Sequence, residues 1–228
     1  MAAAKPKVIN IKPINIQTID FTLRGLTPLI VHAWSDKAKR MIFGNPKDPA
    51  PTSKKRDIRI PVNDFMESLY WLTEKPALGS DDEEAEDIWN KAVLDGAKFG
   101  FPVSGIKQAI ITGAYRAGLD VRQTELRGIM FMVGNTEAST TDVAEIVGTT
   151  PTMREDMVRV GNQSKSADIR YRPEFEQWEI PITMRYHADG KYSIDQLLNL
   201  INYGGMYCGI GEWRPEKDGQ NGMFELKV

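Results

Sequence analysis

Apolar and polar residues recur with two different periods along this chain, and the two periods predict a mixture of strands and helices. Four regions have the β-branched, aromatic or alternating pattern of strands. They are residues 19–34, 126–134, 169–186 and 223–228. Gly25 and Pro28 interrupt the first region, and the third alternates around residues 173–177. We therefore expect the third region to form two strands joined by a turn.

Four other regions repeat apolar residues at helical spacing. They are residues 65–75, 88–96, 101–119 and 193–205. Small polar residues near a helix start are candidate N-caps, because their side chains accept a hydrogen bond from the first turn. The candidates are Asn63 or Asp64, Ser104 and Ser193. Gly118 and the pair Gly204-Gly205 are expected to end the last two helices.

The order of these elements predicts an α+β fold. The N-terminal half gives strand, helices and strand, and the C-terminal half gives two strands, a helix, a glycine-rich loop and a final strand. This order is compatible with a ferredoxin-like β-α-β-β-α-β core that carries large insertions. At 228 residues the chain has room for one large domain or two small ones, and we expect a single domain over residues 1–228.

Charge is segregated along the chain. The formal net charge of −2 does not by itself favour a nucleic-acid-binding protein, which needs cations for the phosphates. Residues 31–60, however, hold eight Lys or Arg against three Asp, a local net of +5. Residues 81–87 hold six carboxylates, and without them the rest of the chain has a net charge of +4. Segregation of this kind allows a basic groove on a mildly acidic protein.

Several classes of protein are not supported by the sequence. No apolar run approaches the roughly 18 residues that cross a bilayer, and no secretory signal is visible, so we expect a cytoplasmic protein without a membrane partner. Cys208 is the single cysteine and is expected to be a buried, inert thiol. The histidines, His32 and His187, form no zinc-binding spacing, and His32 is expected to pack in the core. No metal or cofactor is expected.

Three stretches together resemble the RAMP superfamily, in particular the backbone subunits of CRISPR effector complexes. Residues 23–34 contain a "G-x-x-PL" phrase in a first strand. Residues 101–116 are similar to the family's helix start, with Pro102, Ser104, Lys107 and Arg116 in matching places. Residues 204–226 are similar to its glycine-rich loop, with Gly209, Gly211, Gly219 and Gly222. The compact size points to a phage-borne or standalone relative in a bacterial or phage-infected cell.

The resemblance implies a modified RNA-recognition fold that holds RNA along its backbone. It also implies protomers that stack head to tail in a helical filament, with other effector subunits as possible partners. In the family, an extended hairpin called the thumb wedges between bases, and residues 135–170 would form it here. Residues 35–60 would be the equivalent of the family's basic web insertion.

The candidate binding residues are cations, a helix start and the glycine-rich loop. Cations would neutralise phosphates, and a helix N-terminus or a glycine-rich backbone offers N–H groups to an anion. Cations near Asn, Gln and aromatic residues suit single strands. The set is Lys37, Lys39, Arg40, Lys54, Lys55, Arg56, Ser104, Lys107, Arg116, Arg159, Lys165, Arg170, Arg172, Gly209, Gly211 and Arg214. The hypothesis requires Lys54, Lys107 and Arg170 to converge in one positive channel.

Three functions remain open at this point. The first is a non-catalytic protein that binds single-stranded RNA, or less favourably DNA, as a homo-oligomer or filament. The second is a metal-dependent endoribonuclease that uses Asp36, which follows the first predicted strand. The third is a phage-type interaction or inhibitor protein that acts through the acidic run at residues 81–87. For each candidate residue the simpler alternative is an ordinary cap, turn or surface ion pair.

Overall fold

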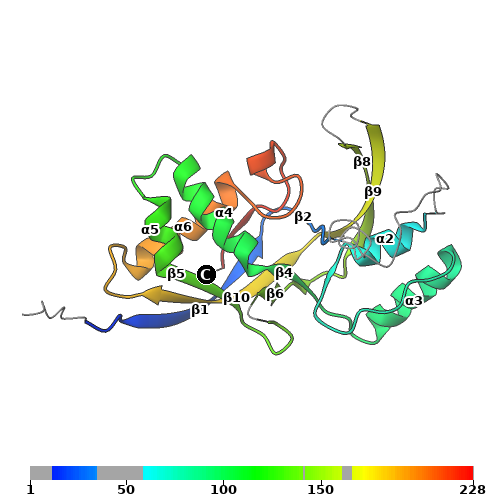
Figure 1. The fold of residues 1–228 in the computed structure, drawn as a ribbon, viewed down its shortest axis with the longest axis horizontal. Helices are drawn as coiled ribbons and strands as arrows, with labels where there is room; N and C mark the ends of the chain where they lie inside the picture. Colours follow the sequence, from blue (N-terminus) through cyan, green and yellow to red (C-terminus); the bar gives the residue numbers. More distant parts are fainter. Residues whose placement is uncertain (1–11, 35–58, 141, 161–165, 228) are drawn as a thin grey trace, which may run out of the picture.

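The computed structural model describes residues 12–34, 59–140, 142–160 and 166–227, and its fold is α+β with antiparallel sheets. The largest sheet has the strand order β11-β1-β10-β5, and every pair in this order is antiparallel (Figure 1). A short strand, β7, also pairs with the start of β10. The strands are β1 (Ile16–Gly25), β5 (Met130–Gly134), β7 (Val147–Gly148), β10 (Trp178–His187) and β11 (Phe224–Leu226).

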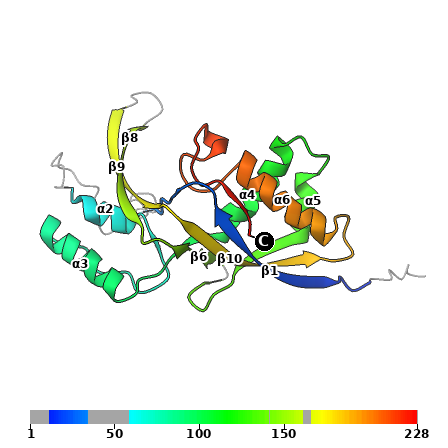
Figure 2. The same cartoon turned by 180° about the vertical axis from the view of Figure 1, so that it is seen from behind.

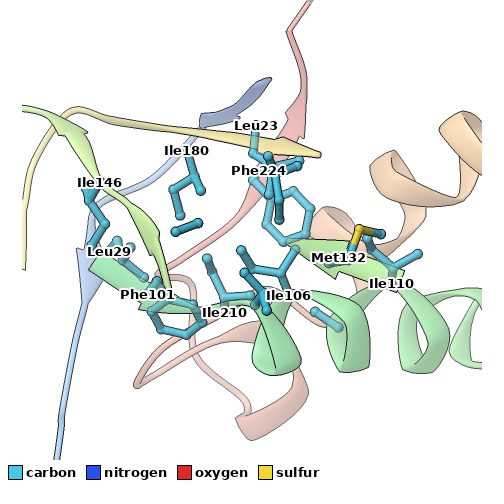
Figure 3. Close-up of a cluster of buried hydrophobic side chains, with 14 of the residues drawn as sticks. Leu23, Leu29, Phe101, Ile106, Ile110, Met132, Ile146, Ile180, Ile210 and Phe224 are labelled. Carbon is cyan, nitrogen blue, oxygen red and sulfur yellow. The ribbon is translucent and has the colours of Figure 1, made fainter. Parts of the chain in front are cut away.

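Helices cover one face of this sheet, as both views show (Figures 1 and 2). They are α4 (Val103–Arg116), α5 (Gln123–Ile129) and α6 (Ile194–Tyr207). Strand β10 buries alternate side chains, because successive residues point to opposite faces of a strand. These side chains meet the apolar stripes of the helices in one core, where Ile180, Ile106 and Phe224 lie together (Figure 3).

Two smaller sheets extend the chain to one side of the main sheet. One has the order β2-β9-β8 and the other β3-β4-β6. Their strands are β2 (Leu29–Ile30), β3 (Tyr70–Trp71), β4 (Phe99–Pro102), β6 (Val143–Glu145), β8 (Thr152–Val160) and β9 (Ser166–Phe175). Helices α2 (Pro61–Glu67) and α3 (Asp82–Leu94) lie beside them, and a short 3-10 helix, η1 (Pro215–Lys217), lies in the glycine-rich loop.

One predicted helix cap is confirmed by the structure, and two other predicted helix boundaries differ from it. Ser193 caps α6, as predicted, and the structure adds a full capping box with Gln196. Helix α6 does not end at Gly204-Gly205 but runs through to Tyr207. Gly205 instead allows α6 to pack closely against β11, because a Cβ on Gly205 would lie 1.7 Å from the carbonyl oxygen of Phe224. Ser104 is not an N-cap, since α4 begins at Val103 and Pro102 takes the cap position.

Three other predicted boundaries are wrong. Asn63 and Asp64 lie inside α2, which begins at Pro61, and Tyr70–Trp71 leave the predicted helix to form β3. The acidic run does not precede α3 but forms its first turns, with Asp81 as the N-cap that accepts a hydrogen bond from the Glu84 amide. Carboxylates there are favourable because they face the positive end of the helix dipole. The strand predicted over 126–134 is helical up to Ile129.

Cys208 is buried, as expected, and burial together with the nearby Glu216 carboxylate raises the pKa of its thiol to about 11. No helix in the described ranges is both long enough and apolar enough to span a bilayer. The described residues also contain no group of three His, Cys, Asp or Glu side chains that could hold a metal ion.

Candidate nucleic-acid interface

Strands β8 and β9 form a long antiparallel hairpin that extends away from the main sheet (Figures 1 and 2). Its register pairs Thr152 with Glu174 at the base and Arg159 with Ala167 near the far end. The predicted turn at 173–177 does join two strands, β9 and β10, but these two strands pair with different partners. Strand β9 instead pairs with β8, so the hairpin of the structure runs from Thr152 to Phe175 and overlaps the predicted insertion at 135–170.

One face of the hairpin is apolar and partly open. Met157 and Ile169 face each other across the two strands, and their exposed fractions are 78% and 38%. Met153 on the same face is also exposed. Closer to the base, Tyr171 packs against the core and lies under the guanidinium of Arg59, 5.6 Å from the ring centre. The outer half of this face therefore exposes large apolar side chains that the described residues leave partly uncovered.

The opposite face of the hairpin is charged and turned toward the body of the protein. Asp156 accepts hydrogen bonds from Arg154 at 2.7 Å and from Arg172 at 3.2 Å. The Arg172 side chain is only 7% exposed, and its Nε is a buried donor with no hydrogen-bond partner among the described residues. Buried charges of this kind are tolerated only when paired, so this network fixes the root of the hairpin.

A second set of contacts links the hairpin root to the glycine-rich loop. Glu212 lies 3.7 Å from Nη2 of Arg172 and 3.6 Å from Nδ1 of His32. Hydrogen bonding to His32 and the charge of Arg172 hold the pKa of Glu212 below its usual range, although burial acts in the opposite direction. On the other side of His32, Nη1 of Arg170 lies 3.5 Å from Nε2. His32 is thus half-buried in a polar network rather than packed in the apolar core, which corrects the sequence prediction.

The glycine-rich loop packs closely against β2 at Gly211. Gly211 has φ +78°, and a Cβ there would lie 2.3 Å from the carbonyl oxygen of Ile30. The amide of Gly209 donates to the carbonyl of Gly204, so this N–H is already used within the fold. Arg214 donates to the carbonyl of Gly211 and pairs with Glu216 at 2.5 Å. The predicted role of these glycines at phosphates stays a prediction.

Six of the predicted residues gather in this part of the fold, but their charges are balanced. They are Arg116, Arg170, Arg172, Gly209, Gly211 and Arg214. Arg116 lies 4.0 Å from Glu216, and Arg170 lies 3.4 Å from Asp168. Because each of these cations has a carboxylate neighbour, this part of the interface positions structural elements and offers little net positive charge to a phosphate. Arg159 differs, since it is exposed and makes no ion pair with any described residue.

Ser104 and Lys107 lie elsewhere. Ser104 is exposed in the first turn of α4. Lys107 donates to the carbonyl of Arg127 at 2.7 Å, and its Nζ lies 4.7 Å from the ring centre of Phe131. These contacts tie Lys107 to α5 and β5, whereas Arg170 contacts His32, which follows β2, and Asp168 in the hairpin. Lys107 and Arg170 share no contact partner among the described residues, and their convergence in one channel stays a prediction.

The other predicted residues lie outside the described ranges. These are Asp36, Lys37, Lys39, Arg40, Lys54, Lys55, Arg56 and Lys165. The third member of the expected channel, Lys54, and the candidate nuclease residue, Asp36, are both in this group.

Two carboxylates of the network, Glu212 and Glu174, were not anticipated from the sequence as partners of Arg172 and Arg154. Ion pairs within the hairpin, of the kind that Asp156 makes, were the simpler alternative considered there. A signal was present in the hairpin, because Arg154 and Asp156 lie two residues apart, as do Arg170 and Arg172. Residues two apart share a face of a strand, so both strands were marked as charged on one side.

Comparison with known proteins gives no family assignment. No family model and no curated protein matches the sequence. Among solved structures, Cmr6 from Pyrococcus furiosus is similar with a TM-score of 0.33 and 11% sequence identity, over 94% of this chain and 100% of that one. A likeness this distant assigns neither a fold family nor a function to the chain.

Proposed function

We propose that this chain binds single-stranded nucleic acid, RNA in preference to DNA, without cutting it, and that the outer half of hairpin β8–β9 wedges between bases. The observation that carries the proposal is the exposed pair of Met157 and Ile169 on a hairpin that extends away from the body. Aliphatic side chains of this size are used by other proteins as wedges that unstack neighbouring bases. An exposed arginine on the same face, Arg159, is placed to meet the strand's phosphates.

The main sheet supports the same proposal. Its order β11-β1-β10-β5, with α4 between β1 and β5 and α6 between β10 and β11, is the order of a ferredoxin-like β-α-β-β-α-β unit. On the face away from α4 and α6, the central strands present Thr18, Asp20, Thr183 and Arg185 rather than aromatic residues. An exposed aromatic side chain on this face, Phe131, lies on the edge strand β5, so we place the main base contacts at the hairpin rather than on the central strands. Head-to-tail assembly along the strand is part of the proposal.

The test is the binding of a fluorescein-labelled RNA oligonucleotide, measured by anisotropy. The double variant Met157→Ala with Ile169→Ala should bind about five- to tenfold more weakly, since the loss of a base contact of on the order of 1 kcal/mol has this effect. Leu94→Ala is the matched control, because Leu94 is 87% exposed on α3 and far from the hairpin in sequence. It should bind like the original protein. Equal affinity of the double variant would remove the wedge from the proposal, and no binding by the original protein would reject the function.

Arg159 provides a second, electrostatic measurement. If it meets one phosphate, Arg159→Gln should reduce the slope of log affinity against log salt concentration by about 0.7, the value for one contact with a single strand. Arg185→Gln is the control, because Arg185 is also exposed but lies on the main sheet, at the position opposite Phe131. If the salt dependence of binding changes for Arg185→Gln and not for Arg159→Gln, the phosphates contact the main sheet and not the hairpin.

A further inference from the structure

A cavity of about 440 Å³ lies next to the root of the hairpin. Its walls come from the chain that follows β2, from the end of α2, and from β3 with the residues after it. Trp34, Leu69, Tyr70 and Trp71 supply apolar surface, and Glu67, Thr73 and Lys75 supply polar groups. The volume lies within the range of roughly 300–1,000 Å³ that is usual for small-ligand sites, and the lining has their mixture of aromatic and polar groups.

The aromatic walls differ in how firmly they are held. Trp71 is fixed, since its Nε1 donates to the carbonyl of Met66 at 2.8 Å and its ring meets the edges of Trp89 and Phe99. Trp34 is 61% exposed, which leaves a large apolar surface open to solvent at the mouth of the cavity. An indole in this position can stack on a planar ligand, and the gain from covering it is substantial because aromatic side chains bury large areas.

Tyr70 lies between the cavity and the polar network. Its ring is half-buried, and its hydroxyl makes no hydrogen bond with any residue that the structure describes. Burial, and to a smaller extent the charge of Glu212, raise the pKa of Tyr70, so the hydroxyl is a neutral donor at physiological pH. A donor without a protein partner beside an aromatic cavity suits a ligand that has acceptor atoms in its plane.

The cavity is connected to the hairpin by direct hydrogen bonds. The amide of Ala33 donates to the carbonyl of Ser68 at 2.8 Å, and the Ser68 hydroxyl donates to the carbonyl of Tyr171 on β9 at 3.2 Å. His32, which precedes Ala33, reaches Arg170 on the same strand. These bonds place the cavity close to β9, the strand that also carries Ile169.

We propose that this cavity holds one unstacked nucleobase of the bound strand, which stacks on Trp34 and accepts a hydrogen bond from Tyr70. The inference rests on the proposed function and extends it, because it names a second contact at the root of the hairpin in addition to the wedge near its end. Every base has a face that can stack, so the site tolerates any sequence.

The experiment compares three variants by anisotropy with the same labelled RNA. Trp34→Ala should weaken binding about tenfold, within the range for one base stacked on an aromatic side chain, whereas Trp34→Phe should keep most of the affinity. Tyr115→Ala is the control, because Tyr115 is 65% exposed on α4 and belongs to no part of the cavity, and it should leave binding unchanged. Since Trp34 is exposed, the alanine variant is expected to fold, and circular dichroism checks this.

A second oligonucleotide, with the same backbone but without bases, separates stacking from phosphate contacts. The original protein should bind it more weakly than RNA, and Trp34→Ala should lose less affinity for it than for RNA. If the original protein binds neither strand, the proposed function itself fails. If it binds RNA and Trp34→Ala binds RNA equally well, the function stands and the base-binding cavity is rejected. The same rejection follows if Trp34→Phe is as weak as Trp34→Ala.

Discussion

At the scale of single residues, the glycines show how little space this fold leaves between its parts. Gly211 combines a left-handed backbone with a close approach to Ile30, so both its φ and its missing side chain are required. Gly128 in α5 has neither constraint, since a Cβ there would meet nothing within 4 Å. The two residues look alike in the sequence, and only the packing of the glycine-rich loop on β2 distinguishes them.

We expect Gly211→Ala to lower the free energy of unfolding by about 1–3 kcal/mol, the usual cost of a strained backbone, plus the displacement of β2. Gly128→Ala should raise it by up to about 1 kcal/mol, because alanine favours the helix more than glycine does. Urea denaturation of both variants measures the two effects. Equal stability of Gly211→Ala and the original protein would mean that the loop does not pack on β2 as described.

Residue-level signals in the sequence succeeded where they were purely local. Ser193 and Gln196 form a capping box whose two hydrogen bonds need only the helix itself, and this cap was predicted. Ser104 also stands near a helix start, but α4 begins at Val103, directly after Pro102, which ends strand β4 and takes the cap position. Strand β4 is paired with β3 and β6, which are distant in the sequence, so no local pattern could place it.

At the scale of elements, the hairpin is held by buried charge at its root and is open at its outer half. Asp156 is 7% exposed and bonds two arginines, one from its own strand and one from β9. The alternation over residues 169–186 predicted strands on both sides of the turn. It could not identify β8 as the partner of β9, because period-two patterns specify faces and not partners.

Asp156→Asn should lower the free energy of unfolding by about 3 kcal/mol, because it leaves Arg172 buried with only Glu212 at 3.7 Å. Asp87→Asn is the control, since Asp87 is exposed on α3, and it should change stability by less than about 0.5 kcal/mol. Denaturation in urea gives the comparison. Hydrogen exchange should locate the loosened amides in β8 and β9, and uniform loosening over the main sheet would contradict the assignment.

At the scale of the whole molecule, the α+β class followed from the order of predicted elements, and the candidate site followed only in part. The sequence identified the arginines of the hairpin and the loop by residue type. It did not reveal that Glu212 pairs with Arg172, because the glycine-rich loop and the hairpin meet only in the folded chain. The basic stretch that gives the local net charge of +5 lies mostly outside the described residues, so its contribution to a positive surface stays a prediction.

The stabilisation from the contact between the glycine-rich loop and the hairpin should depend on pH, because the Glu212 carboxylate takes part in it. Its folded pKa lies below the ordinary value of 4.5, chiefly because of His32 and the arginines nearby. A lowered folded pKa means that the stabilisation is present above the unfolded pKa and is lost as pH falls through the folded value. Because the side chain is 40% exposed, we expect Glu212→Gln to cost only about 1 kcal/mol at neutral pH.

The difference in unfolding free energy between the original protein and Glu212→Gln should therefore shrink as pH falls below 4.5. Other carboxylates, such as Glu125, also have lowered pKa values, but they titrate equally in both proteins and cancel in the difference. Glu176→Gln, at an exposed turn between β9 and β10, should show no such difference at any pH. A difference for Glu212→Gln that stays constant from neutral to acid pH would show that its charge does not join the loop to the hairpin.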